Sequence, residues 1–470
     1  MLGFGQIAPP HALPPHHPGL LAVRFRDSLA GALAAGTPAA DKAPGIVRLL
    51  EHHRAGRLRR VSPLHPDVAR QIDDQGRNSL VDQLRIASQY AGPTARHARG
   101  FLIDAGTRQA MADDLADRLA ADPQVESVGR VPIRFLTART GKTLAADVVP
   151  PPLRNWHLGQ IGWRPAERRG FRDGHGVRVA VLDSGVDVDH PALVGRIRRY
   201  VYRYPKLAAL SARDHVGHGT HVSGIIGGND QGAELCGMCR ADLRVWKIFD
   251  DVPQLDPTLG LFYYLVNPTL YWRALHACIV ERIDVLNLSL GGTTMDAHIE
   301  GPLFHDLLAR GTTIVAAVGN MRQNGSPRCF PAALPHVIAV GATDQHDIVA
   351  PFSSRARHLA LTAPGVGIWS SLPRYPGSPI FAATRAGNRF RRGKPTPRNQ
   401  RFDAWPGTSM AAPLVTGAVA VLIANRGRVS SAEARTLLMR SSDQVPGMKG
   451  KRWTPDYGAG RLNLRRLLAE

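Results

Sequence analysis

The stretch VRVAVLDSG, residues 177–185, decides the fold of most of this chain. An uninterrupted apolar run that ends in an aspartate and small residues is typical of a strand buried on both faces of a parallel sheet. Similar runs recur downstream, separated by segments with helical character: LRVWKI (243–248), IDVLNLSL (283–290), TTIVAAV (312–318) and HVIAV (336–340). Residues 155–470 are therefore predicted to form an α/β domain, a parallel sheet flanked by helices.

A second, smaller unit is predicted upstream, over residues 20–136. LAVRF (21–25) and GFLIDA (100–105) are strand-like runs. Met111, Leu115 and Leu119 recur every four positions, as on one face of a helix, and VESVGRVPI (125–133) is a further strand-like run. This order suggests a small α+β domain. Residues 1–19, rich in proline and histidine, are expected to be flexible. Residues 137–154, with three consecutive prolines, are expected to be a linker.

The formal net charge of +21 raises the question of a nucleic-acid partner. Arginine supplies most of the positive charge, which is scattered without interleaved aromatic residues, so nucleic-acid binding is not expected. Four cysteines make no disulfide framework, and Cys236 and Cys239 are predicted to be structural thiols. The N-terminal residues lack the pattern of a secretion signal, which favours a cytoplasmic protein. No apolar run is long enough to predict a membrane span.

Three short blocks carry residues suited to acyl transfer. Asp183 follows the strand at 177–182, His218 opens the segment HGTHVSG, and Ser409 lies in GTSMAAP before an apolar helix. A serine hydroxyl needs a neighbouring base to attack a carbonyl, and a carboxylate orients that base. Ser409 at a helix N-terminus would also lie close to free backbone N–H groups, which stabilise negative charge.

These blocks, in the chain order Asp, His, Ser, resemble the signatures of the subtilisin family. Two further blocks are similar to the family's substrate-binding strand, VLNLSLGG (285–292), and to its oxyanion block, AAVGN (316–320). The resemblance implies a subtilisin-like fold and a serine endopeptidase that acts through an acyl-enzyme on Ser409. It implies further that Asn320 donates to the oxyanion, and that the substrate is held by Ser289, Leu290, Gly291 and Gly319.

The N-terminal unit resembles a family propeptide, a resemblance carried by ADRLAADPQVESVGRV (116–131). This implies a self-processing precursor that is cut between about Thr137 and Asn155, with its own N-terminal domain as inhibitor and protein or peptide substrates as partners. The resemblance implies no cofactor for the chemistry and leaves structural calcium open. His215, His218 and His221 are spaced by three, but no carboxylate or cysteine completes a metal site, so no metal is predicted and His221 is expected to be a packed helix residue.

Several segments depart from the family pattern. Leu414 replaces a common histidine at a packing position. The segment 250–271 is longer and more apolar than usual, which leaves the second wall of the cleft undefined. An insertion with seven basic residues and no acid at 385–401 is interpreted as a solvated loop, or alternatively as a lid or exosite for acidic partners.

Two other functions remain open on the sequence. A peptide macrocyclase or transpeptidase would use the same acyl-enzyme but resolve it with an amine. A non-catalytic peptide-binding or nucleic-acid-binding protein could retain the fold alone.

Overall fold

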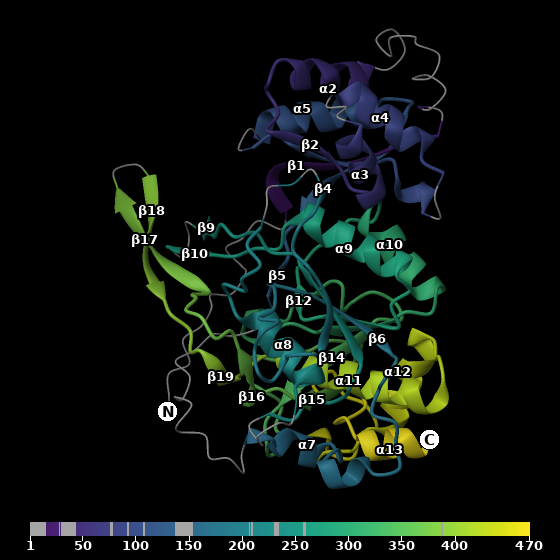
Figure 1. The fold of residues 1–470 in the computed structure, drawn as a ribbon, viewed down its shortest axis with the longest axis vertical. Coiled ribbons are helices and arrows are strands. Elements are labelled where there is room, and N and C mark those ends of the chain that lie inside the picture. The colour runs from purple at the N-terminus through teal and green to yellow at the C-terminus, as the bar shows by residue number, and fades with distance from the viewer. Residues whose placement is uncertain are drawn as a thin grey trace.

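The computed structural model describes residues 16–27, 29, 44–75, 79–91, 94–106, 109–136, 154–205, 207, 210–229, 235–256, 260–386 and 389–470. Figure 1 shows an N-terminal domain stacked on one end of a larger C-terminal domain. The expected linker up to residue 153 and residues 1–15 of the expected flexible segment lie outside the described residues. The first strand begins at His16, inside the segment expected to be flexible.

The N-terminal domain is a four-stranded antiparallel sheet with helices on one face (Figure 1). Its strand order is β2-β3-β1-β4. The strands and helices are β1 (His16–Phe25), β2 (Arg60–Pro63), β3 (Gly100–Asp104), β4 (Val125–Pro132), α2 (Pro44–Arg54), α3 (Pro66–Asp74), α4 (Leu80–Gln89) and α5 (Gln109–Ala120). β2 is a strand that the sequence analysis missed, because its four residues lie in an arginine-rich stretch that has helical character.

Both faces of this small sheet are buried, because successive side chains of a strand point to opposite sides. Leu21 and Val23 of β1 pack into the domain's own core with Leu115 of α5. Ala22, between them, belongs instead to a core cluster of the C-terminal domain that includes Trp272. The N-terminal domain is thus packed against its neighbour through apolar residues.

The C-terminal domain is built on a seven-stranded parallel sheet in the order β15-β14-β13-β11-β6-β8-β7. The strands are β6 (Arg178–Asp183), β7 (Ile197–Val201), β8 (Asp242–Lys247), β11 (Val285–Leu288), β13 (Thr313–Ala317), β14 (Ile338–Thr343) and β15 (Leu359–Pro364). The predicted parallel sheet is confirmed.

Helices cover both faces of the parallel sheet. On one face lie α8 (His218–Gly227), α11 (Thr408–Arg426), α12 (Ser431–Ser441) and α13 (Leu464–Ala469), and on the other α9 (Pro268–Val280) and α10 (Glu300–Ala309); a short helix, α7 (Trp156–Gln160), precedes the sheet. Val179 and Val181 of β6 face the first group, whereas Ala180 and Leu182 face the second. Among the described helices only α11 is long and apolar enough to cross a membrane, and most of it is buried in this core.

The basic insertion forms a β-hairpin rather than the predicted loop. Strands β17 (Ile380–Ala386) and β18 (Arg389–Thr396) extend the short strands β9 (Gln254–Asp256) and β10 (Leu261–Tyr263) into a four-stranded sheet. The hairpin projects from the body of the domain at the left of Figure 1, and Arg391, Arg392 and Lys394 face solvent. Beyond it, β19 (Arg401–Trp405) pairs with β16 (Ile368–Leu372).

Candidate active site

Asp183 and His218 meet where β6 ends and α8 begins. Asp183 Oδ1 accepts a hydrogen bond from His218 Nδ1 at 2.8 Å, and both side chains are fully buried. The same oxygen accepts the backbone N–H of Ser184 at 2.7 Å. Because Nδ1 donates its hydrogen to the carboxylate in this bond, the basic lone pair of the imidazole lies on Nε2. No described residue forms a hydrogen bond with Nε2.

Ser409 is the second residue of α11, a helix that packs against α8. Its Oγ donates to the carbonyl of Ser289 at 3.0 Å, and Ser289 Oγ donates to the carbonyl of Ser409 at 3.0 Å. This hydroxyl must leave the Ser289 carbonyl before it can donate to His218 Nε2, with which it shares no hydrogen bond here. Such realignment is common, because catalytic hydrogen bonds often form only when substrate is bound.

Asn320 lies beside the N-terminus of the same helix. Its Oδ1 accepts the backbone N–H of Thr408 at 3.0 Å and the Thr408 hydroxyl at 2.9 Å. The amide oxygen is thereby held by the residue that precedes Ser409, and Nδ2 is the donor group of this side chain. Gly319, just before it, has φ of +107°, which favours glycine. A Cβ there would lie 3.3 Å from Ser354 Oγ.

A buried carboxylate that the sequence analysis missed, Asp214, connects the strand carrying Asp183 to the helix carrying His218. Asp214 Oδ1 accepts from Ser184 Oγ at 2.8 Å and from the Gly217 N–H at 2.8 Å. Its Oδ2 accepts the N–H and the hydroxyl of Thr220, at 3.0 and 2.7 Å. The position of Asp214 four residues before His218 was the available signal. These bonds satisfy N–H groups of the first helical turn and fix the orientation of α8.

The last residues of the N-terminal domain, 133–136, which we call the tail, lie in the predicted substrate-binding cleft. Strand β5 (Phe135–Leu136) pairs antiparallel with β12 (Leu290–Gly291), with Leu136 opposite Leu290. On the other side, the Val266 N–H donates to the Arg134 carbonyl at 3.2 Å. The segment 250–271 therefore supplies the second wall that the sequence left undefined. The tail is held between two backbone edges, as an extended peptide would be.

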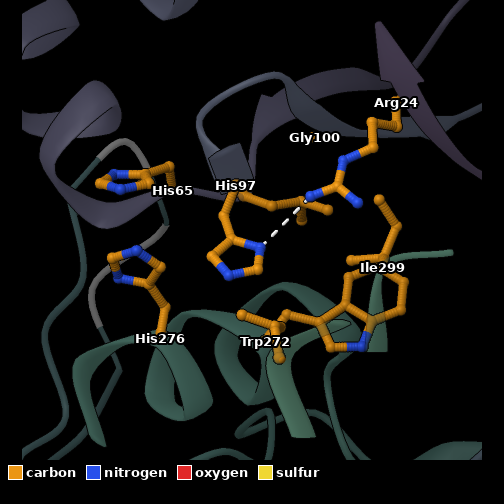
Figure 2. A pocket seen from close by; sticks show the side chains of 9 residues that line it. Arg24, His65, His97, Gly100, Trp272, His276 and Ile299 are labelled. Atoms are coloured by element: carbon orange, nitrogen blue, oxygen red, sulfur yellow. Dashed lines mark hydrogen bonds between the residues drawn. The ribbon is translucent and has the colours of Figure 1, made fainter. Parts of the chain in front are cut away.

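The rest of the N-terminal domain packs on α9 and α10 through a pocket lined by histidines (Figure 2). His65 and His97 come from the N-terminal domain and His276 from α9; the ring centroids of His65 and His276 are 3.9 Å apart. His97 Nδ1 lies 3.3 Å from Arg24 Nη2, and its Nε2 lies 2.7 Å from an Asp306 oxygen. Buried polar contacts thus join the two domains in addition to the apolar ones.

The remaining candidate residues have structural surroundings. His221 is buried in α8, stacks on Trp405 with ring centroids 5.0 Å apart, and lies 3.1 Å from the Asp403 carbonyl through Nε2, as expected for a packed residue. Cys236 and Cys239 are buried thiols that form no disulfide bond, and burial raises the pKa of Cys239 to about 11. Leu414 is buried in the core of the domain. Among the described residues there is no group of three or more His, Cys, Asp or Glu side chains arranged to hold a metal ion.

The domain pairs a carboxylate with an imidazole and has a serine at a helix N-terminus beside a peptide-binding edge, which are the features of a serine peptidase. Comparison with known proteins gives the family: the model of the subtilase family matches residues 174–460. Subtilisin E of Bacillus subtilis (strain 168) is 30% identical over 311 residues, which cover 66% of this chain and 69% of that protein. The major intracellular serine protease of the same strain is 29% identical over 258 residues, 53% of this chain and 69% of that protein.

A likeness in structure extends over both domains. The crystal structure of fervidolysin from Fervidobacterium pennivorans, a keratinolytic enzyme related to subtilisin, superposes with a TM-score of 0.65 at 22% identity. The match covers 97% of this chain and 61% of that one, and shows the shared fold. The chain belongs to the subtilase family, whose serine peptidases use an Asp-His-Ser triad and need no cofactor for catalysis.

Proposed function

We propose that this chain is a serine endopeptidase in which Ser409 attacks the peptide carbonyl and His218 takes its proton. His218 then returns the proton to the leaving amine, while Asp183 holds the imidazole and stabilises its charged form. The Asn320 amide and the Ser409 backbone N–H hold the oxyanion. The observation that supports these roles best is the tail itself, a peptide strand paired with β12 next to Ser409.

The N-terminal domain is the inhibitor of this site. Its tail occupies the edge on which a substrate would pair, so substrate cannot bind until the tail leaves. Leu136 pairs with Leu290, the neighbour of Ser289, whose carbonyl accepts the Ser409 hydroxyl. The precursor therefore cuts itself at the beginning of the interval from about Thr137 to Asn155. A bond held on the same chain has a high effective concentration, so even a slow enzyme completes this single turnover.

The experiment compares the wild-type chain with Ser409→Ala, purified in the same way and run on a denaturing gel. We expect the wild type to separate into a large and a small fragment, and the variant to stay a single full-length band. The N-terminal sequence of the large fragment locates the cut bond. An uncut wild type that still hydrolyses peptides would contradict the propeptide role and leave the triad standing. A cut Ser409→Ala chain would contradict self-processing.

A further inference from the structure

One side chain of the tail enters the C-terminal domain much more deeply than a main-chain strand pair requires. Arg134 is 3% exposed, although arginine is among the residues least often buried. Its Nη2 donates to Glu300 Oε2 at 2.6 Å, and its Nη1 donates to the Thr294 carbonyl at 2.5 Å. Two separate nitrogens are therefore engaged at once, an arrangement that suits the planar fork of a guanidinium.

The acceptors belong to a pocket that the C-terminal domain builds. Glu300 opens α10 and is 1% exposed, and the Tyr271 hydroxyl of α9 donates to its other oxygen at 3.2 Å. The pocket is lined by Val266, Pro268, Tyr271, Trp272 and Glu300, with Pro132 and Arg134 from the N-terminal domain. Glu300 is thus a carboxylate in an apolar enclosure, and Arg134 is the cation that compensates it.

Gly292, which follows β12, leaves the space in which the arginine enters. A Cβ on this residue would lie 2.8 Å from Arg134 Nη1 and 2.1 Å from the carbonyl oxygen of Ile133. The latter contact is far below any real Cβ distance, so only glycine lets the tail approach this closely. Gly292 therefore gives the arginine space to enter, and Glu300 gives it a charge partner, when the arginine is on a strand paired with β12.

After the tail has left, the pocket should still bind an arginine side chain in preference to a neutral one. Departure of the tail removes the cation and leaves Glu300 in an enclosure where an unpaired carboxylate is unfavourable. We propose that the pocket of Tyr271, Gly292, Thr294 and Glu300 is a substrate subsite selective for arginine, at the position two residues before the one paired with Leu290. This inference rests on the proposed function, because it assumes that substrate pairs with β12 as the tail does.

The test uses enzyme purified from the full chain and held at pH 5 until its N-terminal fragment has been released, and internally quenched peptides that copy residues 132–141. In one peptide Arg134 is kept, in the second it is replaced by citrulline, a neutral side chain of the same shape, and in the third by lysine. Removing one partner of a buried charge pair has a large effect on binding, so we expect kcat/KM to fall at least 30-fold for citrulline. Lysine should give an intermediate value, because one ammonium replaces the two engaged nitrogens of the fork. Mass spectrometry of the products verifies that the same bond is cut in each peptide.

Two enzyme variants localise the effect. Glu300→Gln removes the charge and should reduce the ratio between the arginine and citrulline peptides to a few-fold. Glu433→Gln, the same change at an exposed position in α12, should keep the wild-type ratio. Should Glu300→Gln fail to fold, the three peptides on wild-type enzyme decide the question alone.

The outcomes separate the two proposals. Equal hydrolysis of the arginine and citrulline peptides by wild type overturns the arginine subsite and leaves the peptidase standing. A preference for arginine that persists in a folded Glu300→Gln enzyme also overturns it. If no peptide is hydrolysed and a fluorophosphonate fails to label Ser409, the proposed function is wrong, and the proposal of an arginine subsite, which depends on it, is wrong too.

Discussion

Acidification should loosen the contact between the two domains through His276. This residue of α9 is 2% exposed, and neither of its ring nitrogens has a hydrogen-bond partner among the described residues (Figure 2). Burial lowers its pKa to about 4, with Asp67 opposing this change and Arg310 adding to it. His65, His97 and Arg24 also line the pocket, and none of them supplies a negative charge. An imidazolium formed here would be desolvated, and the negative charge of Asp67 does not offset that cost.

The direction and size of the effect follow from proton binding. An unfolded histidine has a pKa near 6.5, so between pH 6.5 and 4 the unfolded chain binds more protons at this position than the folded chain. The stabilising contribution of neutral His276 is fully present above pH 6.5 and is lost as the pH falls toward 4. The whole difference corresponds to about 3 kcal/mol, of which about 2 kcal/mol is lost between pH 7 and pH 5.

The assay is urea unfolding of the full chain carrying Ser409→Ala, so that no cleavage intervenes, followed by circular dichroism at pH 7 and pH 5. The loss of unfolding free energy between the two pH values should be about 2 kcal/mol larger in this parent than in the same chain with His276→Gln. His175→Gln, a change of the same kind at an exposed histidine, should behave as the parent. An identical pH dependence in parent and His276→Gln would refute the reasoning.

Two further predictions concern catalysis. Asn320→Ala should lower kcat by about 10²–10³-fold with little change in KM, because the amide acts on charge that appears only in the transition state. This is the magnitude known for the corresponding donor of subtilisin. An unchanged kcat with a raised KM would contradict the assignment. Asp214→Ala should lower kcat by about 10²-fold through misplacement of His218, and Asp214→Asn, which keeps one acceptor oxygen, should recover part of that loss. Steady-state kinetics on one peptide tests both, and a pure KM effect at Asp214 would show that it does not position the base.

The sequence predicted what depends on local pattern. The strand at 177–182 was recognisable because a strand of a buried parallel sheet is apolar on both faces, and the structure places Val181 and Leu182 in different core clusters. Asp183 was found because it lies at the end of such a strand, and His218 because it opens a helix that begins with small residues; the structure brings the two to 2.8 Å. Ser409 was placed at a helix N-terminus, as the structure has it.

Pairings between distant segments could not be predicted in the same way. The hairpin β17–β18 was interpreted as a loop because glycine, proline and a run of arginines hide its pattern, and its pairing with β10 joins residues more than a hundred positions apart. Val266 contributes a backbone N–H, which any residue other than proline could supply, so no side-chain signal marks it. Glu300 reads as an ordinary acidic residue in a first helical turn until Arg134 is seen beside it.

The two attachments of the N-terminal domain respond to different events, and this difference bears on how the enzyme becomes active. A cut after the tail would remove the covalent connection but none of the contacts of Arg134 or of the histidine pocket, so the cut alone would leave the N-terminal domain bound. The Arg134–Glu300 pair is buried. Burial alone would lower the pKa of Arg134, but the neighbouring Glu300 carboxylate outweighs it and the pKa is raised, so the guanidinium stays charged over the range in which an imidazole titrates. The histidine pocket, by contrast, loses stability as the pH falls below 6.5. Release of the N-terminal domain therefore requires a dissociation step after cleavage. This dissociation should be faster at pH 5 than at pH 7, and His276→Gln should make the difference between the two rates smaller.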